Sequence, residues 1–185
     1  MPGPRRAVLL LPFLLFACAP GGSLPRLPQS DASQYILSPG DQVRIITVGQ
    51  DELTGEFRID DSGRIAVPML GSLRAAGLAP DALGQEVAGA LQHGGLIRSP
   101  SVSVEITQYR PVSVLGEVNK PGEFPYHPGM TLLSAVALAG GFTPRAVEDD
   151  ASVLRDNGKR STEWRASPAS RLQPGDVVTV FERRF

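Results

Sequence analysis

Short segments with apolar residues at every second position dominate the chain from residue 35 onward. A period of two is typical of strands that bury one face. We expect strands at 42–48, 56–60, 64–70, 101–108, 111–118, 123–127, 151–156, 159–164 and 176–183. Asn157–Gly158 predicts a hairpin between two of them, and "DSG" at 61–63 predicts another between 56–60 and 64–70, with Gly63 at a positive φ.

Two segments carry the helical period instead. Residues 80–93 repeat leucine and valine at every fourth position, and Pro80 suits the first turn of a helix. A second helix is expected to begin after Thr131, a good N-cap, and to end at the glycine pair 140–141. Because this second helix is apolar almost all round, we expect it to be packed on several sides.

One phrase occurs twice in the chain. The stretches "LSPGDQVRI" (37–45) and "LQPGDVVTV" (172–180) both read Leu-x-Pro-Gly-Asp-x-Val. Proline and glycine favour a turn, and aspartate can accept hydrogen bonds from nearby backbone N–H groups as the chain enters a strand. We interpret both as strand-initiating turns, formed by Pro39, Gly40 and Asp41 and by Pro174, Gly175 and Asp176.

The composition agrees with short strands joined by turns, because the 185 residues include 20 Gly and 17 Pro. This length accommodates one or two small domains, each with its own core. A formal net charge of −1 provides no basic surface for nucleic acid, so we expect no nucleic-acid partner.

Residues 1–17 are predicted to be a signal peptide. Two arginines precede "AVLLLPFLLFA" (7–17), which is too short to span a bilayer. The single cysteine, Cys18, follows directly, and "LFAC" resembles the lipobox of bacterial lipoproteins, in which this cysteine becomes the lipidated first residue. An ordinary signal peptide beside an incidental cysteine is the alternative. Residues 18–34 then read as the lipidated cysteine and a flexible tether, with a reach of about 20 Å.

Longer stretches resemble a known family. Residues 35–48 ("YILSPGDQVRIITV") and 56–78 ("EFRIDDSGRIAVPMLGSLRAAGL") resemble the opening domain of bacterial outer-membrane polysaccharide export lipoproteins. Residues 114–146 ("VLGEVNKPGEFPYHPGMTLLSAVALAGGFTPRA") resemble the SLBB β-grasp module that follows it in that family. The resemblance implies an α+β protein with a polysaccharide export domain at 35–109 and a β-grasp domain at 110–185, whose sheet the final strand completes.

The same resemblance implies a function. It implies a periplasm-facing outer-membrane lipoprotein of a Gram-negative bacterium that helps to export capsule or exopolysaccharide. The implied assembly is a ring of identical subunits around the polymer, with an inner-membrane polysaccharide copolymerase or tyrosine-kinase partner. Longer members continue into an amphipathic pore helix that does not follow "VVTVFERRF" here, so a separate outer-membrane pore protein is expected. A monomeric periplasmic module that binds a glycan or another ligand is the alternative.

No catalytic motif, metal site or cofactor site stands out, so we expect neither enzyme activity nor a cofactor. His93 and His127 lack neighbours with the spacing of zinc ligands. The pair Asp60–Asp61 stands beside a turn, where aspartate is common for backbone reasons. We expect "EDD" (148–150) to be a solvated acidic loop and Arg183–Arg184 to be a frayed basic tail.

The turn "NKPGEFPY" (119–126) is a candidate for ligand contact. Its first two residues offer hydrogen-bond donors, and its two aromatic rings offer faces on which a sugar can stack. Contact between subunits is the alternative for these residues, and Pro121–Gly122 is also a good structural turn in its own right. The candidate residues are Asn119, Lys120, Phe124 and Tyr126.

Overall fold

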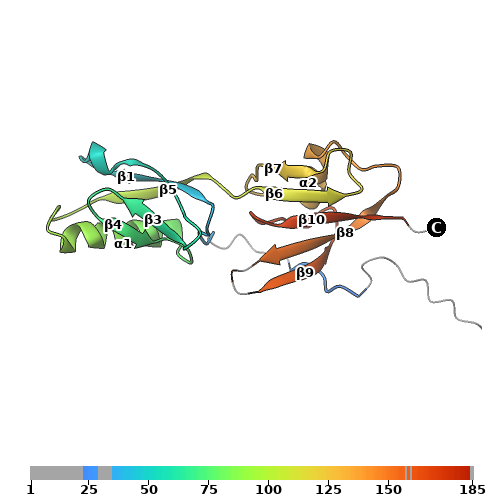
Figure 1. Cartoon of the computed structure of the whole chain (residues 1–185), viewed down its shortest axis with the longest axis horizontal. Helices are drawn as coiled ribbons and strands as arrows, with labels where there is room; N and C mark the ends of the chain where they lie inside the picture. The colour runs from blue at the N-terminus through green and yellow to red at the C-terminus, as the bar shows by residue number, and fades with distance from the viewer. Residues whose placement is uncertain (1–22, 29–34, 157, 159, 184–185) are drawn as a thin grey trace, which may run out of the picture.

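The computed structural model describes residues 23–28, 35–156, 158 and 160–183. In these residues the chain forms two α+β domains that lie end to end along the long axis of the molecule (Figure 1). Each domain has its own hydrophobic core, one built from residues between Leu37 and Leu91 and the other from residues between Val112 and Val180 together with Leu27. The predicted α+β fold class is confirmed.

The N-terminal domain is built on a three-stranded antiparallel sheet with the order β2-β1-β5. A separate antiparallel hairpin, β3–β4, contributes Ile65 and Val67 to the same core. The central strand β1 buries Val43 and Ile45 completely. The elements are β1 (Gln42–Thr47), η1 (Asp51–Leu53), β2 (Gly55–Arg58), β3 (Arg64–Val67), β4 (Gly71–Arg74), α1 (Pro80–His93) and β5 (Val102–Gln108).

The predicted hairpin between residues 56–60 and 64–70 is wrong. A turn does form, because the Gly63 N–H donates to the Asp60 carbonyl (2.9 Å) and Gly63 has a φ of +78°. Beyond the turn the strands part, since β2 pairs with β1 whereas β3 pairs with β4. The sequence "DSG" therefore specifies the turn, while the strand partners are set by which faces the whole domain can bury.

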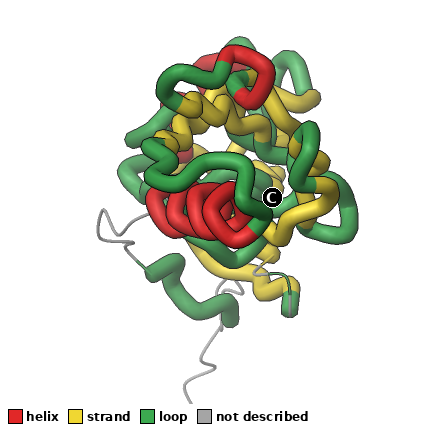
Figure 2. Tube along the Cα trace, turned by 90° about the vertical axis from the view of Figure 1, so that its left-hand side faces the viewer, coloured by secondary structure: helices red, strands yellow, loops and turns green. Residues whose placement is uncertain are grey.

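Helix α1 has the bounds that its sequence predicts. Pro80 occupies its first position, and Gly94 follows its last residue as the C-cap. The buried side chains Val87 and Leu91 belong to the core of the N-terminal domain, and the helix packs against β5. In Figure 2 this helix lies at the end of the molecule that faces the viewer.

The C-terminal domain is a five-stranded sheet with the order β7-β6-β10-β8-β9. Its last strand, β10, lies in the centre, parallel to β6 and antiparallel to β8. This order, with one helix between two hairpins, is the predicted β-grasp arrangement. The elements are β6 (Val112–Gly116), β7 (Gly122–Phe124), α2 (Leu132–Leu138), β8 (Ala146–Asp156), β9 (Ser161–Ala166) and β10 (Val177–Glu182).

Helix α2 is packed on one side only, so the prediction that it is packed on several sides is wrong. Its start is well defined, because the Thr131 hydroxyl accepts the Ser134 N–H (3.2 Å) and the Ser134 hydroxyl accepts the Thr131 N–H (2.8 Å). One face packs into the core, while Leu133 and Leu138 are about half exposed, at 51% and 46%. The sheet covers a single face of this helix, and the buried residues are Leu132, Ala135 and Val136.

Residues 25–27 lie along the outer edge of β9. The Leu27 N–H donates to the Arg165 carbonyl, and the Arg165 N–H donates to the Pro25 carbonyl, both at 2.8 Å. The Leu27 side chain is only 8% exposed and belongs to the core of the C-terminal domain. Part of the segment that we expected to be a flexible tether is thus packed against this domain.

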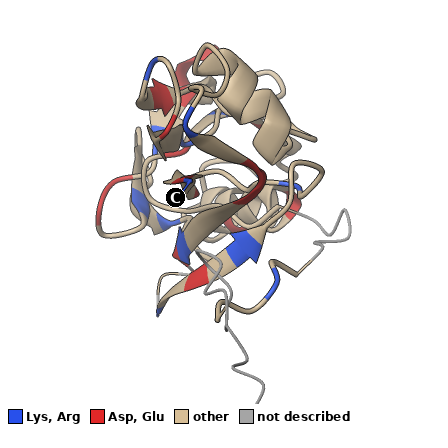
Figure 3. Cartoon of the chain, turned by 90° about the vertical axis from the view of Figure 1, so that its right-hand side faces the viewer, with Lys and Arg blue, Asp and Glu red and all other residues tan. Residues whose placement is uncertain are grey.

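Residues 148–150 lie within strand β8 and not in the solvated loop that we expected. Asp150 pairs with Arg165 of the neighbouring strand β9, and Glu148 pairs with Arg183 at 3.5 Å. Figure 3 shows acidic and basic residues interspersed over this end of the molecule. The acidic run is therefore balanced by arginines across the sheet.

Arg183 is fixed to the C-terminal domain, so the prediction of a frayed tail is wrong at this residue. Its backbone N–H donates to the Arg145 carbonyl and its Nε donates to the Ala146 carbonyl, both at 2.8 Å. Arg184 lies outside the described residues.

Among the described residues no helix is long and apolar enough to cross a membrane.

Candidate functional site at the domain junction

The first Pro-Gly-Asp turn is held by the buried side chain of Asp41. Its Oδ2 accepts hydrogen bonds from the Ser38 N–H (2.9 Å) and from the Tyr35 hydroxyl (2.7 Å). Its Oδ1 accepts the backbone N–H of Arg110 (3.1 Å), and the Arg110 Nε lies 3.6 Å from the same oxygen. Asp41 therefore ties the start of the N-terminal domain to the linker that leaves it.

The second Pro-Gly-Asp turn repeats this arrangement in the other domain. The Oδ2 of Asp176 accepts the Gln173 N–H (2.7 Å), three residues earlier, as Asp41 does with Ser38. Arg155 of β8 donates to both oxygens of Asp176, from Nε at 2.8 Å and from Nη2 at 2.7 Å. This ion pair is almost completely buried, and it fixes the turn to the sheet.

Both turns meet at Arg110, which lies between their glycines. A Cβ on Gly40 would lie 3.3 Å from the Arg110 Cγ, and a Cβ on Gly175 would lie 2.9 Å from its Nη1. Both glycines also have a positive φ, of 95° and 84°. The N–H of Gly175 donates to the carbonyl of Pro111, the next linker residue (3.1 Å). The repeated phrase thus starts one strand in each domain and also places both turns against the linker.

Three tyrosines from different segments gather beside this junction. The ring of Tyr109 makes edge-to-face contacts with Tyr35 and Tyr126, with centroids 5.1 Å and 5.4 Å apart. Burial raises the pKa of all three hydroxyls, and the hydrogen bond to Asp41 raises the pKa of Tyr35 further. The three side chains are accordingly neutral at physiological pH.

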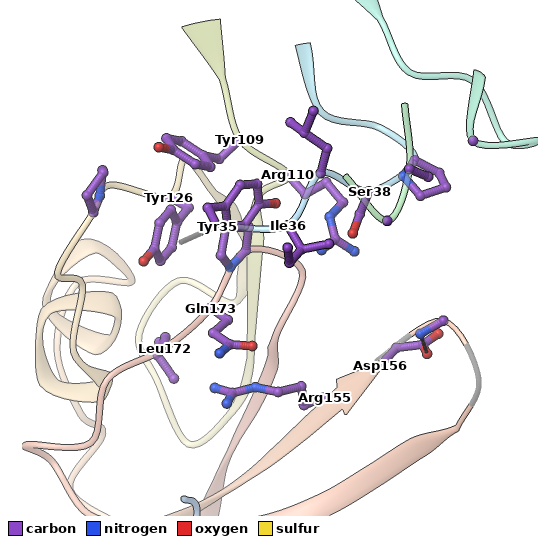
Figure 4. Close-up of a pocket in the computed structure, with 18 of the residues that line it drawn as sticks. Tyr35, Ile36, Ser38, Tyr109, Arg110, Tyr126, Arg155, Asp156, Leu172 and Gln173 are labelled. Atoms are coloured by element: carbon purple, nitrogen blue, oxygen red, sulfur yellow. Dashed lines mark hydrogen bonds between the residues drawn. The ribbon is translucent and has the colours of Figure 1, made fainter. Parts of the chain in front are cut away.

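The junction opens into a cleft of about 930 Å³ between the two domains. Figure 4 shows the three tyrosines together on one side of it, with Gln173 and Arg155 below them and Asp156 toward the opposite side. Both domains supply polar side chains to this cleft. Its charged and amide side chains are Asp61, Arg74, Arg110, Arg155, Asp156, Arg171 and Gln173.

The structure separates the four candidate residues of the turn at 119–126. Only Tyr126 lines the cleft. Asn119 donates from Nδ2 to the carbonyl of Gly140 (2.7 Å), and Lys120 donates its backbone N–H to Ala139 (2.8 Å), so both lie at the end of α2. Phe124 is partly buried against the core. Their contact with sugar or with another subunit stays a prediction.

The sequence pointed to Pro39, Asp61 and Pro174 only as turn residues, and it did not identify the other residues of the cleft. Tyr109 and Arg110 stand at the expected domain boundary, and Tyr35 stands just before the first repeated turn. Residues at a boundary between two cores can line an interdomain cleft. The position of these three residues in the sequence could therefore have indicated the cleft. Arg155 and Arg171 gave no such signal, because only the fold brings them to the junction.

The described residues contain no cluster of three or more His, Cys, Asp or Glu side chains that could hold a metal ion. The Nδ1 of His93 lies 2.7 Å from the Gly89 carbonyl within α1, and His127 is exposed in a loop.

Asp60 accepts hydrogen bonds from the Ser62 hydroxyl (2.6 Å) and the Arg64 N–H (2.9 Å), which lower the pKa of its carboxyl. Asp60 thus stabilises a turn. Cys18 lies outside the described residues.

Family models match both halves of the chain. The family model for "Polysaccharide biosynthesis/export protein" matches residues 29–107, and the model for "SLBB domain" matches residues 111–162. The chain is similar to the exopolysaccharide production protein ExoF of Rhizobium meliloti (strain 1021), with 33% identity over 172 residues that cover 87% of this chain and 39% of that protein. It is also similar to the polysialic acid transport protein KpsD of Escherichia coli, with 30% identity over 132 residues that cover 69% of this chain and 23% of that protein.

The chain therefore spans about two fifths of the length of the first relative and about a quarter of the second. The two family matches meet at residues 107–111, where the linker passes between the two hydrophobic cores. With an export domain followed directly by an SLBB domain, the chain belongs to the polysaccharide export family.

Proposed function

We propose that this protein is an envelope component of a system that exports capsule or exopolysaccharide from a Gram-negative bacterium. The observation that carries the proposal is the family match over both domains. The relatives named for exopolysaccharide production and polysialic acid transport support the same role. These names describe production and transport, so the proposed activity is passage of a polymer and not cleavage of a bond.

The proposed attachment is a lipid anchor at Cys18. This anchor would hold the protein on the periplasmic side of the outer membrane. An apolar run followed directly by a lone cysteine supports this proposal. More than one acyl chain is needed for stable membrane attachment, and a lipobox cysteine would receive them. Because residues 25–27 pack on β9, the anchor would hold the C-terminal domain close to the membrane.

The proposed assembly is a ring of identical subunits that surrounds the polymer. Strands β2, β5 and β7 lie at the edges of their sheets, and exposed edges favour pairing or coverage by another chain. A closed ring would cover such edges without leaving open ends. An inner-membrane copolymerase or tyrosine kinase and a separate outer-membrane pore protein are the proposed partners.

The second candidate function is that of a monomeric periplasmic module that binds a glycan. The cleft between the domains favours it, because the cleft lies within a single chain. The two candidates differ in the mass of the native particle. A monomer in mild detergent would favour the module, whereas a multiple of the chain mass would favour the ring.

Deletion of the gene tests the proposed function. We expect the deletion strain to retain polysaccharide inside the cell envelope and to release little into the medium. The wild-type gene should restore release, and Cys18→Ser should leave the protein unprocessed or free of the membrane. Normal release from the deletion strain would contradict the export role, and unchanged processing and attachment of Cys18→Ser would contradict the lipid anchor.

A further inference from the structure

We infer that the cleft at the domain junction binds a segment of saccharide chain and recognises it through hydroxyl groups and ring faces instead of net charge. This inference rests on the proposed function and narrows it to a site and a class of ligand. It is carried by the polar side chains of the two walls, by their charge balance and by the tyrosines beside them.

Both walls present exposed side chains with planar polar groups. Asp61 and Arg74 come from the N-terminal domain, while Asp156 and Arg171 come from the C-terminal domain. None of these four forms a salt bridge within the described part of the chain. A guanidinium donates and a carboxylate accepts, so together they match the adjacent hydroxyls of a sugar, each of which can do both.

The charges of the cleft cancel. Four arginines line it, and two of them face the buried carboxylates of Asp41 and Asp176 directly behind the surface. The two remaining arginines, Arg74 and Arg171, are matched in number by Asp61 and Asp156. Strong selection of a polyanion needs an excess of positive charge. The cleft has no such excess. A neutral ligand rich in hydroxyl groups fits this balance.

The tyrosines supply the apolar part of the site. Tyr126 is partly buried and lines the cleft, and its edge-to-face contact with Tyr109 restrains its ring. A ring that is already held in place loses little freedom when a ligand stacks on it. Aromatic rings with one polar end suit a sugar, whose ring faces are apolar and whose rim is polar.

The same features disfavour a peptide as the ligand. Most of the lining comes from loops, so the cleft does not offer a long strand edge to which a peptide could add. Among the lining residues Ile36 is an exposed large aliphatic side chain, at 50%, whereas Leu37 and Leu172 are buried in the cores. An apolar anchor of a peptide would therefore find little surface to cover.

Titration of the full chain in detergent with defined hexasaccharides tests the inference. The neutral probes are β-1,4-, β-1,3- and α-1,4-linked glucose hexasaccharides, and the charged probe is hexagalacturonate. We expect at least one neutral probe to bind, with an affinity that changes little between low and high salt. Arg171→Gln and Asp61→Asn should each weaken binding about tenfold, since each removes a hydrogen bond to a charged group.

Arg98→Gln is the matched control, because Arg98 is exposed, lies outside the cleft and undergoes the same change of charge. Tyr126→Leu removes the aromatic ring on which a sugar would stack. The unfolding temperature of this variant is measured to show that it is folded. If Arg98→Gln weakens binding as much as Arg171→Gln does, the inference is overturned. Preferential, salt-sensitive binding of hexagalacturonate would also overturn it.

The inference and the proposed function can fail separately. If no neutral hexasaccharide binds while the deletion strain still fails to release polysaccharide, the saccharide site is wrong and the export role stands. If a neutral hexasaccharide binds at the cleft while the deletion strain releases polysaccharide normally, the site stands and the export role is wrong. A peptide segment crosslinked at Tyr126, with no binding of any hexasaccharide, would also overturn the saccharide site.

Discussion

Gly116 ends strand β6 at a point where β10 runs directly alongside. Its φ is +82°, and a Cβ at this position would lie 2.2 Å from the carbonyl oxygen of Val180 and 3.0 Å from its nitrogen. These neighbours are backbone atoms of the central strand, which are held by hydrogen bonds on both sides. Any side chain at Gly116 must therefore push two parallel strands apart.

We predict that Gly116→Ala lowers the free energy of unfolding by at least about 3 kcal/mol, because backbone strain and a backbone clash add together. Gly122→Ala is the control, since a Cβ there would meet nothing within 4 Å. The control should change stability by no more than about 1 kcal/mol. Urea denaturation measures both variants, and equal midpoints would contradict the close approach of β6 and β10.

Tyr35 makes the stability of the N-terminal domain sensitive to alkaline pH. Burial and the hydrogen bond to Asp41 raise its pKa in the folded protein above the ordinary value of about 10. The folded state therefore holds this proton more tightly than the unfolded state does. The resulting stability is fully present below pH 10 or so and is lost as the pH rises from there toward the folded pKa.

We predict that Tyr35→Phe lowers stability at neutral pH by about 1–2 kcal/mol, because Asp41 loses one hydrogen-bond donor. Between about pH 9 and pH 11 the variant should lose stability less steeply than the wild type. Tyr109 and Tyr126 titrate in both proteins, so the difference between the two slopes reports on Tyr35 alone. Parallel slopes in denaturation curves across this range would contradict the assignment.

At the scale of single elements, local signals in the sequence determined the helices better than the strand partners. The bounds of α1 follow from Pro80 and the glycines after His93, and the start of α2 follows from Thr131. The pairing of β2 and β3 with other strands could not be predicted from "DSG", because partners depend on distant residues. The one-sided burial of α2 was missed for the same reason, since composition does not show which faces a sheet can cover.

The pair formed by Arg155 and Asp176 connects β8 to the turn that begins β10. Both side chains are nearly inaccessible, with exposures of 7% and 1%. Removing one partner leaves a buried charge without its counterion, which costs far more than the pair itself contributes. The strands and the second turn therefore depend on this contact more than on any exposed pair.

We predict that Arg155→Met lowers the free energy of unfolding by about 3–5 kcal/mol. Asp150→Asn, which breaks the partly exposed pair with Arg165, should lower it by no more than about 1 kcal/mol. The double variant Arg155→Met/Asp176→Asn should recover part of the loss, because no buried charge is then left unpaired and the amide oxygen can still accept the Gln173 N–H. Equal effects of the two single variants in chemical denaturation would show that burial of the Arg155 pair is unimportant.

At the scale of the whole molecule, the candidate site depends on how the two domains meet. The repeated Pro-Gly-Asp phrase was evident in the sequence, and its strand-initiating role could be predicted from residue types. The meeting of both turns at Arg110 could not, because residues 40 and 175 are brought together only when both domains are folded and joined. The candidate residues at 119–126 were chosen for chemistry alone, and the fold places only Tyr126 at the junction.

The central place of β10 determines the order in which the C-terminal domain can be completed. This strand follows every other strand of its sheet in the sequence, yet it lies between β6 and β8. Until it is inserted, the β6–β7 and β8–β9 hairpins have no strand to join them, and the core that Leu27 enters lacks Val178 and Val180. The N-terminal domain is closed by β5 before this point. During synthesis the first domain can therefore fold while the second still lacks its final strand and leaves the edges of its two hairpins unpaired.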